Sequence, residues 1–222
     1  MPSASQRIAA PLKRLHGWWQ IQQWLRGPHS SPVPPKAYKH ATIRRAGQQY
    51  HCPILIETGT YTGGAIAALM HDFREIYSIE LHRPFFERQQ QRFASEPHIT
   101  LLSGDSGEEL QKLVPTLTAR AVFWLDAHGS GTKRTPNAPA PQAPVLRELK
   151  AILPYVVTAG HVVLIDDAHT LQSGRKWGRG IADPMAEIRQ EFLTKHPDWQ
   201  WDVINNIITI CRPKANVSTD AA

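Results

Sequence analysis

Short apolar runs alternate with amphipathic segments along most of this chain. From residue 53 onward, the runs have the length of buried strands, and the segments between them have the apolar spacing of helices. The predicted strands cover residues 54–57, 75–81, 99–103, 121–126, 161–166, 201–205 and 207–212, and the predicted helices cover residues 64–70, 83–94, 107–113, 145–153 and 184–196. This alternation predicts an α/β fold with a mostly parallel seven-stranded sheet, helices on both faces and a C-terminal antiparallel hairpin.

A Trp-rich segment with a different pattern precedes this region. Over Pro11–Arg26, "PLKRLHGWWQIQQWLR", apolar residues recur at spacings of three and four, which predicts an amphipathic helix that Gly27-Pro28 ends. The proline-rich stretch Pro28–Pro35 predicts a linker. Because 222 residues suit one substantial domain with an appendage, we expect a basic helical extension and linker over residues 1–40, the α/β domain over residues 41–215 and a disordered tail over residues 216–222.

The net charge of +6 belongs to the N-terminal part of the chain. Residues 1–56 contain eight Lys or Arg and no acid, whereas the remainder carries 17 basic and 19 acidic residues. The α/β domain is therefore nearly neutral, and we expect no nucleic-acid partner. Two alternatives stay open for the basic helix: it packs on the domain or on a partner subunit in a homodimer, which we favour, or residues 11–26 contact an anionic membrane surface.

The chain has no apolar run long enough to span a bilayer and no secretory signal pattern. We expect a cytoplasmic protein, with the inner face of the membrane as an alternative location. Its two cysteines, Cys52 and Cys211, form neither a disulfide framework nor a metal motif, so we expect buried structural thiols.

Acidic residues stand at the end of five successive predicted strands. They are Glu57, Glu80, Asp105, Asp126 and the pair Asp166-Asp167. A single acid after a strand is ordinary turn or capping chemistry. Parallel strands end at one edge of a sheet, however, and five converging acids would crowd negative charge there unless cations or hydroxyl donors were bound.

The first strand runs into a glycine-containing loop, "ETGTYTGG" at Glu57–Gly64, and then into a helix, which is the arrangement of a nucleotide-type cofactor site. Glu80 ends the second strand, where a carboxylate can bind the ribose hydroxyls of an adenosine cofactor. Tyr61 stands where a dinucleotide loop has its second glycine, which argues against the pyrophosphate of NAD. S-adenosylmethionine has no pyrophosphate and tolerates Tyr61.

These segments resemble the class I S-adenosylmethionine-dependent methyltransferases, in particular the metal-dependent O-methyltransferases of the catechol type and of macrolide and aminocoumarin sugar pathways. The resemblance rests on "ETGTYTGG", "IYSIEL", "LLSGDS", "FWLDAH" and "VVLIDDAH", in family order over about residues 53–170. Catechol-type members also carry an aromatic residue at the position of Tyr61. The resemblance implies a Rossmann-like fold, S-adenosylmethionine as cofactor and a divalent metal, with Mg²⁺ expected.

The resemblance also implies roles for individual residues. Cofactor contacts are expected from Glu57, Gly59, Thr60, Tyr61, Gly63, Glu80, Leu81, Asp105, Ser106 and Asp126. Metal ligands are expected at Asp126, Asp166 and Asp167, whose oxygens suit a hard cation. Sugar-modifying relatives place a general base at the position of His128, whereas catechol-type members use a lysine one residue later, where this chain has Gly129. His128 is therefore our candidate base, and a catechol acceptor is disfavoured.

Two basic loops are expected to line the acceptor side of the same pocket. They supply Lys133, Arg134, Arg175 and Lys176, and His169 follows the acidic pair. Such residues could bind an anionic glycan or small-molecule acceptor, or could simply form a solvated surface. We expect an O-methyltransferase acting on a hydroxyl, preferably of a sugar. The alternatives are a metal-independent methyltransferase for an amine or nucleic acid, and a non-catalytic, membrane-associated cofactor-binding module.

Overall fold

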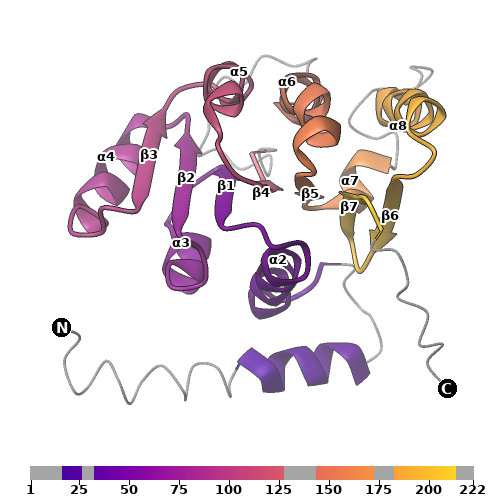
Figure 1. Cartoon of the computed structure of the whole chain (residues 1–222). Coiled ribbons are helices and arrows are strands. Elements are labelled where there is room, and N and C mark those ends of the chain that lie inside the picture. Colours follow the sequence, from indigo (N-terminus) through magenta and orange to yellow (C-terminus); the bar gives the residue numbers. More distant parts are fainter. Residues whose placement is uncertain (1–16, 27–32, 128–143, 173–182, 214–222) are drawn as a thin grey trace, which may run out of the picture.

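The computed structural model of the chain describes residues 17–26, 33–127, 144–172 and 183–213. Seven strands form one sheet in the order β3-β2-β1-β4-β5-β7-β6 (Figure 1). The strands are β1 (Ile54–Thr58), β2 (Glu75–Glu80), β3 (Ile99–Ser103), β4 (Ala121–Leu125), β5 (Val162–Ile165), β6 (Gln200–Ile204) and β7 (Ile207–Cys211). The first five run parallel, and β7 pairs antiparallel with both β5 and β6. The predicted α/β sheet and its terminal hairpin are confirmed.

Helices cover both faces of this sheet (Figure 1). They are α2 (Lys36–Tyr50), α3 (Gly64–Leu69), α4 (Arg83–Arg92), α5 (Ser106–Leu113), α6 (Pro144–Ala159), α7 (Ala168–Gln172) and α8 (Pro184–Lys195), with a 3-10 turn at Val114–Thr116. Alternate residues of each central strand enter two separate cores. In β4, Phe123 packs with residues of α5, α6 and α8, whereas Val122 and Trp124 pack with Ile43 of α2 and Ile66 of α3. Both faces of the sheet are therefore buried, as the apolar runs predict.

The strand order changes direction between β1 and β4. From β1 the chain passes outward to β2 and β3, then returns to β4 on the other side of β1. At such a switch point the loops after the two strands diverge and leave a crevice at the carboxyl edge of the sheet, which is where ligands bind in open α/β sheets. The fold thus directs attention to the residues that follow β1 and β4.

Helix α2 is the main element that the sequence pattern missed. Its sequence, KAYKHATIRRAGQQY, is largely polar, and only Ile43, Ala46 and Gly47 are buried. Two buried apolar side chains in fifteen residues do not produce a recognisable helical stripe. The helix also runs across residue 40, where we expect the N-terminal extension to end. The division of the chain into extension and domain stays a prediction.

Helix α6 continues beyond its predicted end. We expected it to stop before Pro154, but the helix extends to Ala159 with Pro154 inside it. An interior proline costs about 3 kcal/mol because it removes a backbone hydrogen bond. Beyond Pro154, α6 buries Val156 completely and packs the partly buried Val157 against the same core, and burial of such a side chain contributes up to about 1.5–3 kcal/mol. Tertiary packing therefore outweighs the local preference.

The Trp-rich segment is helical over residues 17–26, below α2 in Figure 1. Trp24 packs on Tyr38 of α2, with ring centroids 5.3 Å apart, while Trp18 and Trp19 are 61% and 52% exposed. Within the described ranges, none of the helices has the length and apolarity needed to cross a bilayer. Cys52 and Cys211 are buried free thiols, as predicted.

Candidate active site

The loop after β1 is held in a strained conformation against the end of β4. Gly59, Tyr61 and Gly63 all have positive φ, at 85°, 49° and 67°. A side chain at Gly59 would place its Cβ 2.9 Å from the carbonyl oxygen of Asp126, so only glycine allows this approach. The residues predicted for the cofactor loop therefore lie at the switch point, in contact with the first residue after β4.

Glu80 ties the end of β2 to the same loop. Its carboxylate accepts hydrogen bonds from the backbone N–H of Tyr61 at 2.7 Å and of His82 at 2.8 Å. Each carboxylate oxygen keeps a further lone pair for a ribose hydroxyl. The Tyr61 ring packs edge-on against Phe85 at 4.8 Å and is 45% exposed, and the neighbouring Leu81 is exposed as well. These positions suit the predicted contacts with an adenosine moiety.

Glu57 lies beneath the loop as a buried acid. Ser78 Oγ lies 2.7 Å from Glu57 Oε2, to which it donates, and 2.6 Å from Thr60 Oγ1. Burial raises the pKa of Glu57 to about 8; the hydrogen bond from Ser78 lowers it, and the nearby acids Asp126 and Glu80 raise it further. A cation bound above this group would stabilise its charged form.

Asp105 and Ser106 have structural partners. Asp105 caps α5 by accepting from the backbone N–H of Gly107 at 3.0 Å, and it pairs with Arg147 at 2.6 Å. Ser106 is buried and donates to Glu148 Oε1 at 2.5 Å. The predicted adenine contacts of Asp105 and Ser106 stay predictions.

Glu148 is fully buried, and sequence reasoning missed it because it comes from α6, 42 residues after Ser106. Burial raises its pKa to about 7, against the effect of hydrogen bonds from Ser106 and Thr58. Together with Glu57 and the acids after β4 and β5, Glu148 makes the carboxyl edge of the sheet strongly acidic.

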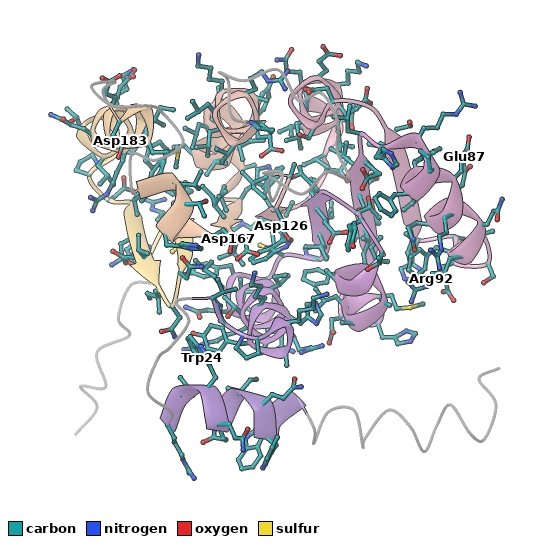
Figure 2. All side chains as sticks on the ribbon, turned by 180° about the vertical axis from the view of Figure 1, so that it is seen from behind. Trp24, Glu87, Arg92, Asp126, Asp167 and Asp183 are labelled. Carbon is teal, nitrogen blue, oxygen red and sulfur yellow. The ribbon has the colours of Figure 1, made fainter. Side chains whose placement is uncertain are left out.

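The three predicted metal ligands meet at this edge, and a lysine lies among them. Lys39, from the first turn of α2, forms an ion pair with Asp166 and lies 3.8 Å from Asp167 Oδ1. Burial raises the pKa of Asp166, and the Lys39 ammonium lowers it, so the ion pair favours the ionised carboxylate. Burial and the neighbouring Asp166 raise the pKa of Asp126. Figure 2 shows Asp126 and Asp167 near one another above α2.

The chemistry of this donor set fits a divalent cation. Three carboxylates provide hard oxygen ligands, and the Lys39 ammonium is a stand-in cation at two of them. In this conformation the described ranges contain no group of three or more His, Cys, Asp or Glu side chains close enough to coordinate an ion. The three carboxylates therefore have the charge and the oxygen ligands that a divalent metal needs. Two of them are paired with Lys39, in a geometry that does not coordinate an ion.

The turn between β6 and β7 completes this side of the site. Asn205 and Asn206 both have positive φ, as the predicted hairpin requires. Asn206 Nδ2 donates to Asp167 Oδ1 at 3.4 Å, and Asn206 Oδ1 accepts from the backbone N–H of His169 at 2.8 Å. Asn205 donates to the hydroxyl of Tyr38. Because β7 runs antiparallel to β5, its first residues return to the edge where β5 ends.

Five residues predicted for the base and the acceptor lie outside the described ranges: His128, Lys133, Arg134, Arg175 and Lys176. Of the predicted acceptor residues, only His169 is described. Its ring Nδ1 lies 2.9 Å from Asn206 Oδ1, so the imidazole is held against the β6–β7 turn.

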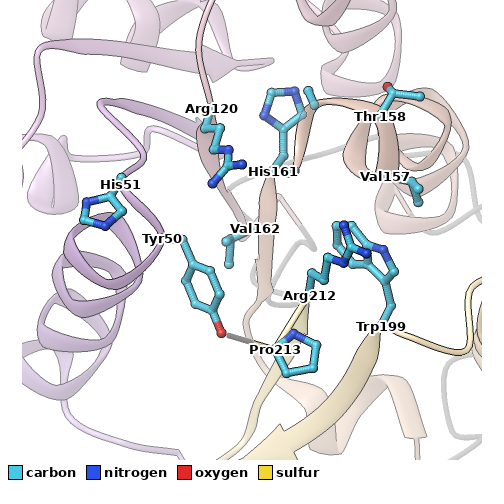
Figure 3. Close-up of a pocket in the computed structure, with 12 residues that line it drawn as sticks. Tyr50, His51, Arg120, Val157, Thr158, His161, Val162, Trp199, Arg212 and Pro213 are labelled. Carbon is cyan, nitrogen blue, oxygen red and sulfur yellow. The ribbon is translucent and has the colours of Figure 1, made fainter. Parts of the chain in front are cut away.

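A pocket of about 260 Å³ lies at the opposite end of the strands (Figure 3). Arg120, just before β4, and His161, just before β5, line it together with Tyr50, Trp199 and Arg212. The His161 ring accepts from the backbone N–H of Ala121 at 2.9 Å, and burial lowers the pKa of His161 to about 4. The polar groups here stabilise the amino ends of the strands, away from the acidic edge.

No family model matches the chain, and no curated protein matches it. Solved structures do match. A putative caffeoyl-CoA O-methyltransferase from Staphylococcus aureus is 13% identical with a TM-score of 0.56, covering 91% of this chain and 98% of that chain. TomG from Streptomyces achromogenes, an O-methyltransferase involved in tomaymycin synthesis and solved in complex with SAM, is 15% identical with a TM-score of 0.55, covering 91% and 90%.

The SAH-bound methyltransferase PaMTH1 from Podospora anserina is 14% identical with a TM-score of 0.53, covering 96% of this chain and 98% of that chain. At these identities the likeness shows the fold. The chain has the Rossmann-like fold found in these methyltransferases, over nearly its whole length and nearly theirs.

Proposed function

We propose that this protein is an S-adenosylmethionine-dependent O-methyltransferase that acts on a hydroxyl group, preferably of a sugar, with the help of a divalent cation. The observation that carries the proposal is the convergence of the Gly59–Gly63 loop, Glu80 and the acids after β4 and β5 at the β1/β4 switch point. The SAM- and SAH-bound structures of the same fold support the choice of cofactor.

The residues of the loop have defined tasks in this proposal. The backbone around Gly59 binds the amino acid end of the cofactor, and Glu80 accepts hydrogen bonds from its ribose. When bound, S-adenosylmethionine supplies a methyl group on a positively charged sulfonium. The buried Glu57 and the neighbouring Asp126, whose pKa values are both raised, favour a positive ligand at this edge by Coulomb attraction.

Asp126, Asp166 and Asp167 would hold the divalent cation. When bound, it would lower the pKa of the acceptor hydroxyl and fix the position of its oxygen. The acceptor oxygen would take the methyl group from the sulfonium in exchange for its own proton, and the cofactor would leave as the neutral thioether. The hydroxyl proton passes to a base, which we assign to His128; an unchanged kcat in His128→Ala would exclude that role.

The preference for a sugar acceptor is supported by His128 and Gly129, the pattern of sugar-modifying relatives rather than of catechol-type ones. Lys133, Arg134, Arg175 and Lys176 would bind an anionic acceptor. For the helix containing Trp18 and Trp19 we keep packing on the domain or on a partner subunit as the favoured role, which the contact of Trp24 with Tyr38 supports. Contact with an anionic membrane surface is the alternative, supported by the exposure of Trp18 and Trp19 on a basic extension.

Titration calorimetry with S-adenosylmethionine, with and without Mg²⁺, tests the cofactor and metal parts separately. We expect binding in both conditions, and methyl transfer to glycan hydroxyls only with the metal. Asp167→Ala should abolish transfer and leave cofactor binding largely intact. If S-adenosylmethionine does not bind, the proposed function is wrong. If methyl transfer continues in EDTA, the protein is a metal-independent methyltransferase. The ion pair of Lys39 with Asp166 favours this alternative, because Lys39 already supplies a cation at a proposed metal ligand.

A further inference from the structure

Lys39 is held in place by the packing of α2. Ile43, one turn further along this helix, is fully buried in the core beneath β4 and β5. At the far end of α2, the hydroxyl of Tyr50 contacts the sulfur of Cys211 at 3.1 Å. With both parts of the helix anchored to the sheet, the Lys39 side chain extends to the carboxyl end of β5 and is only 15% exposed.

The contacts of Lys39 are with two of the three proposed metal ligands. Its ammonium pairs with Asp166, whose side chain is 1% exposed, and lies 3.8 Å from Asp167 Oδ1. Three carboxylates against one ammonium leave a formal charge of −2 when all are ionised. This negative charge favours binding of a cation, but a cation on the oxygens that Lys39 contacts would meet like-charge repulsion from the ammonium at contact distance.

We propose that Lys39 is an internal competitor of the divalent cation: its ammonium occupies the Asp166 and Asp167 carboxylates in the metal-free protein and must leave before the metal is coordinated. The inference rests on the metal part of the proposed function. The buried Asp166 is thereby kept paired in the metal-free protein, because an unpaired buried charge is costly. The apparent metal affinity is then the intrinsic affinity multiplied by the fraction of molecules in which Lys39 has left the site.

Manganese binding to the full chain tests this directly, without any acceptor or assay of turnover. Free Mn²⁺ is measured by its electron paramagnetic resonance signal for the wild type, for Lys39→Met and for Lys36→Met. Lys36 is the matched control, since it is an exposed lysine of the same helix. We expect Lys39→Met to bind Mn²⁺ at least about tenfold more tightly than the wild type, which corresponds to a Lys39-free site in no more than about a tenth of molecules. Lys36→Met should match the wild type.

Thermal unfolding gives a second readout. Without metal, Lys39→Met should melt at a lower temperature than Lys36→Met, because Asp166 loses its ion pair with the Lys39 ammonium. Mn²⁺ should raise the melting temperature of Lys39→Met more than that of the wild type. If Lys39→Met does not fold, Lys39→Gln replaces it, since the amide can still donate to Asp166 without competing as a cation. Equal Mn²⁺ affinity in the wild type and in a folded Lys39 variant would overturn the inference, and so would no Mn²⁺ binding in either. Methyl transfer by the wild type in EDTA then decides the proposed function independently.

Discussion

At the scale of single residues, the acidic edge is defined by carboxyl groups whose pKa values are raised by burial. Glu57 and Glu148 are fully enclosed, with pKa values of about 8 and 7. Such groups lower the stability of a fold at the pH at which they must ionise. Their position at one edge suits a site that binds positive ligands, because a bound positive charge stabilises the ionised form of these carboxyl groups.

Glu148→Gln should change how stability depends on pH. The pKa of Glu148 is raised from 4.5 to about 7 by burial, with Asp105 raising it and Arg147 lowering it as further neighbours. The unfolded chain therefore loses this proton first, and the wild type loses stability as pH rises from about 4.5 to about 7, by up to about 1.4 kcal/mol per pH unit. Glu148→Gln has no carboxyl group to ionise, so its free energy of unfolding should increase relative to that of the wild type by up to about 3 kcal/mol between pH 5 and pH 8.

Urea unfolding of the ligand-free protein at several pH values measures the effect. The control is Glu191→Gln: Glu191 is an exposed acid of α8 whose pKa is lowered by Lys195, so this variant should show no such gain. Parallel pH curves for Glu148→Gln and the wild type would contradict the assigned pKa.

At the scale of elements, the β1–α3 loop offers a matched pair of glycines. Gly59 has φ of 85° and its added Cβ would meet the Asp126 carbonyl, whereas Gly64 opens α3 with nothing within 4 Å. Gly59→Ala should lower the free energy of unfolding by about 1–3 kcal/mol through backbone strain and weaken S-adenosylmethionine binding. Gly64→Ala should be neutral or stabilising by about 0.5–1 kcal/mol. Urea unfolding and calorimetry check both, and equal effects of the two substitutions would argue against close contact at Gly59.

The sequence was sufficient to predict the strands, because each is a short apolar run with clear boundaries, and the acids at their ends, because parallel strands end together. It did not predict α2, whose buried residues are too few to form a stripe. Nor could it place Lys39 beside Asp166, since the two are 127 residues apart. The part of the candidate site that escaped prediction is thus the part that depends on how helices pack across the sheet.

At the scale of the whole molecule, the N-terminal segment of the chain combines a basic sequence with the exposed Trp18 and Trp19. If residues 11–26 contact a membrane, the full chain should float with vesicles containing phosphatidylglycerol and should not float with neutral phosphatidylcholine vesicles. Replacing Trp18 and Trp19 by serine should abolish flotation, while Trp24 keeps its contact with Tyr38. The control is serine at Gln22 and Gln23. Flotation that is unaffected by the tryptophan changes, or absent altogether, would favour packing or assembly roles for this helix.

The position of α2 also bears on how the protein can be shortened for crystallisation or expression. Residue 41 is a natural choice for a truncated start if the polar residues before it are regarded as a tail. Such a cut would remove the first turn of α2, and with it Lys39 and the Tyr38 hydroxyl that Asn205 contacts. The buried Asp166 would then lose its ion pair with Lys39, and a loss of yield or activity would result from the cut itself. Shortened forms should therefore begin before Pro35.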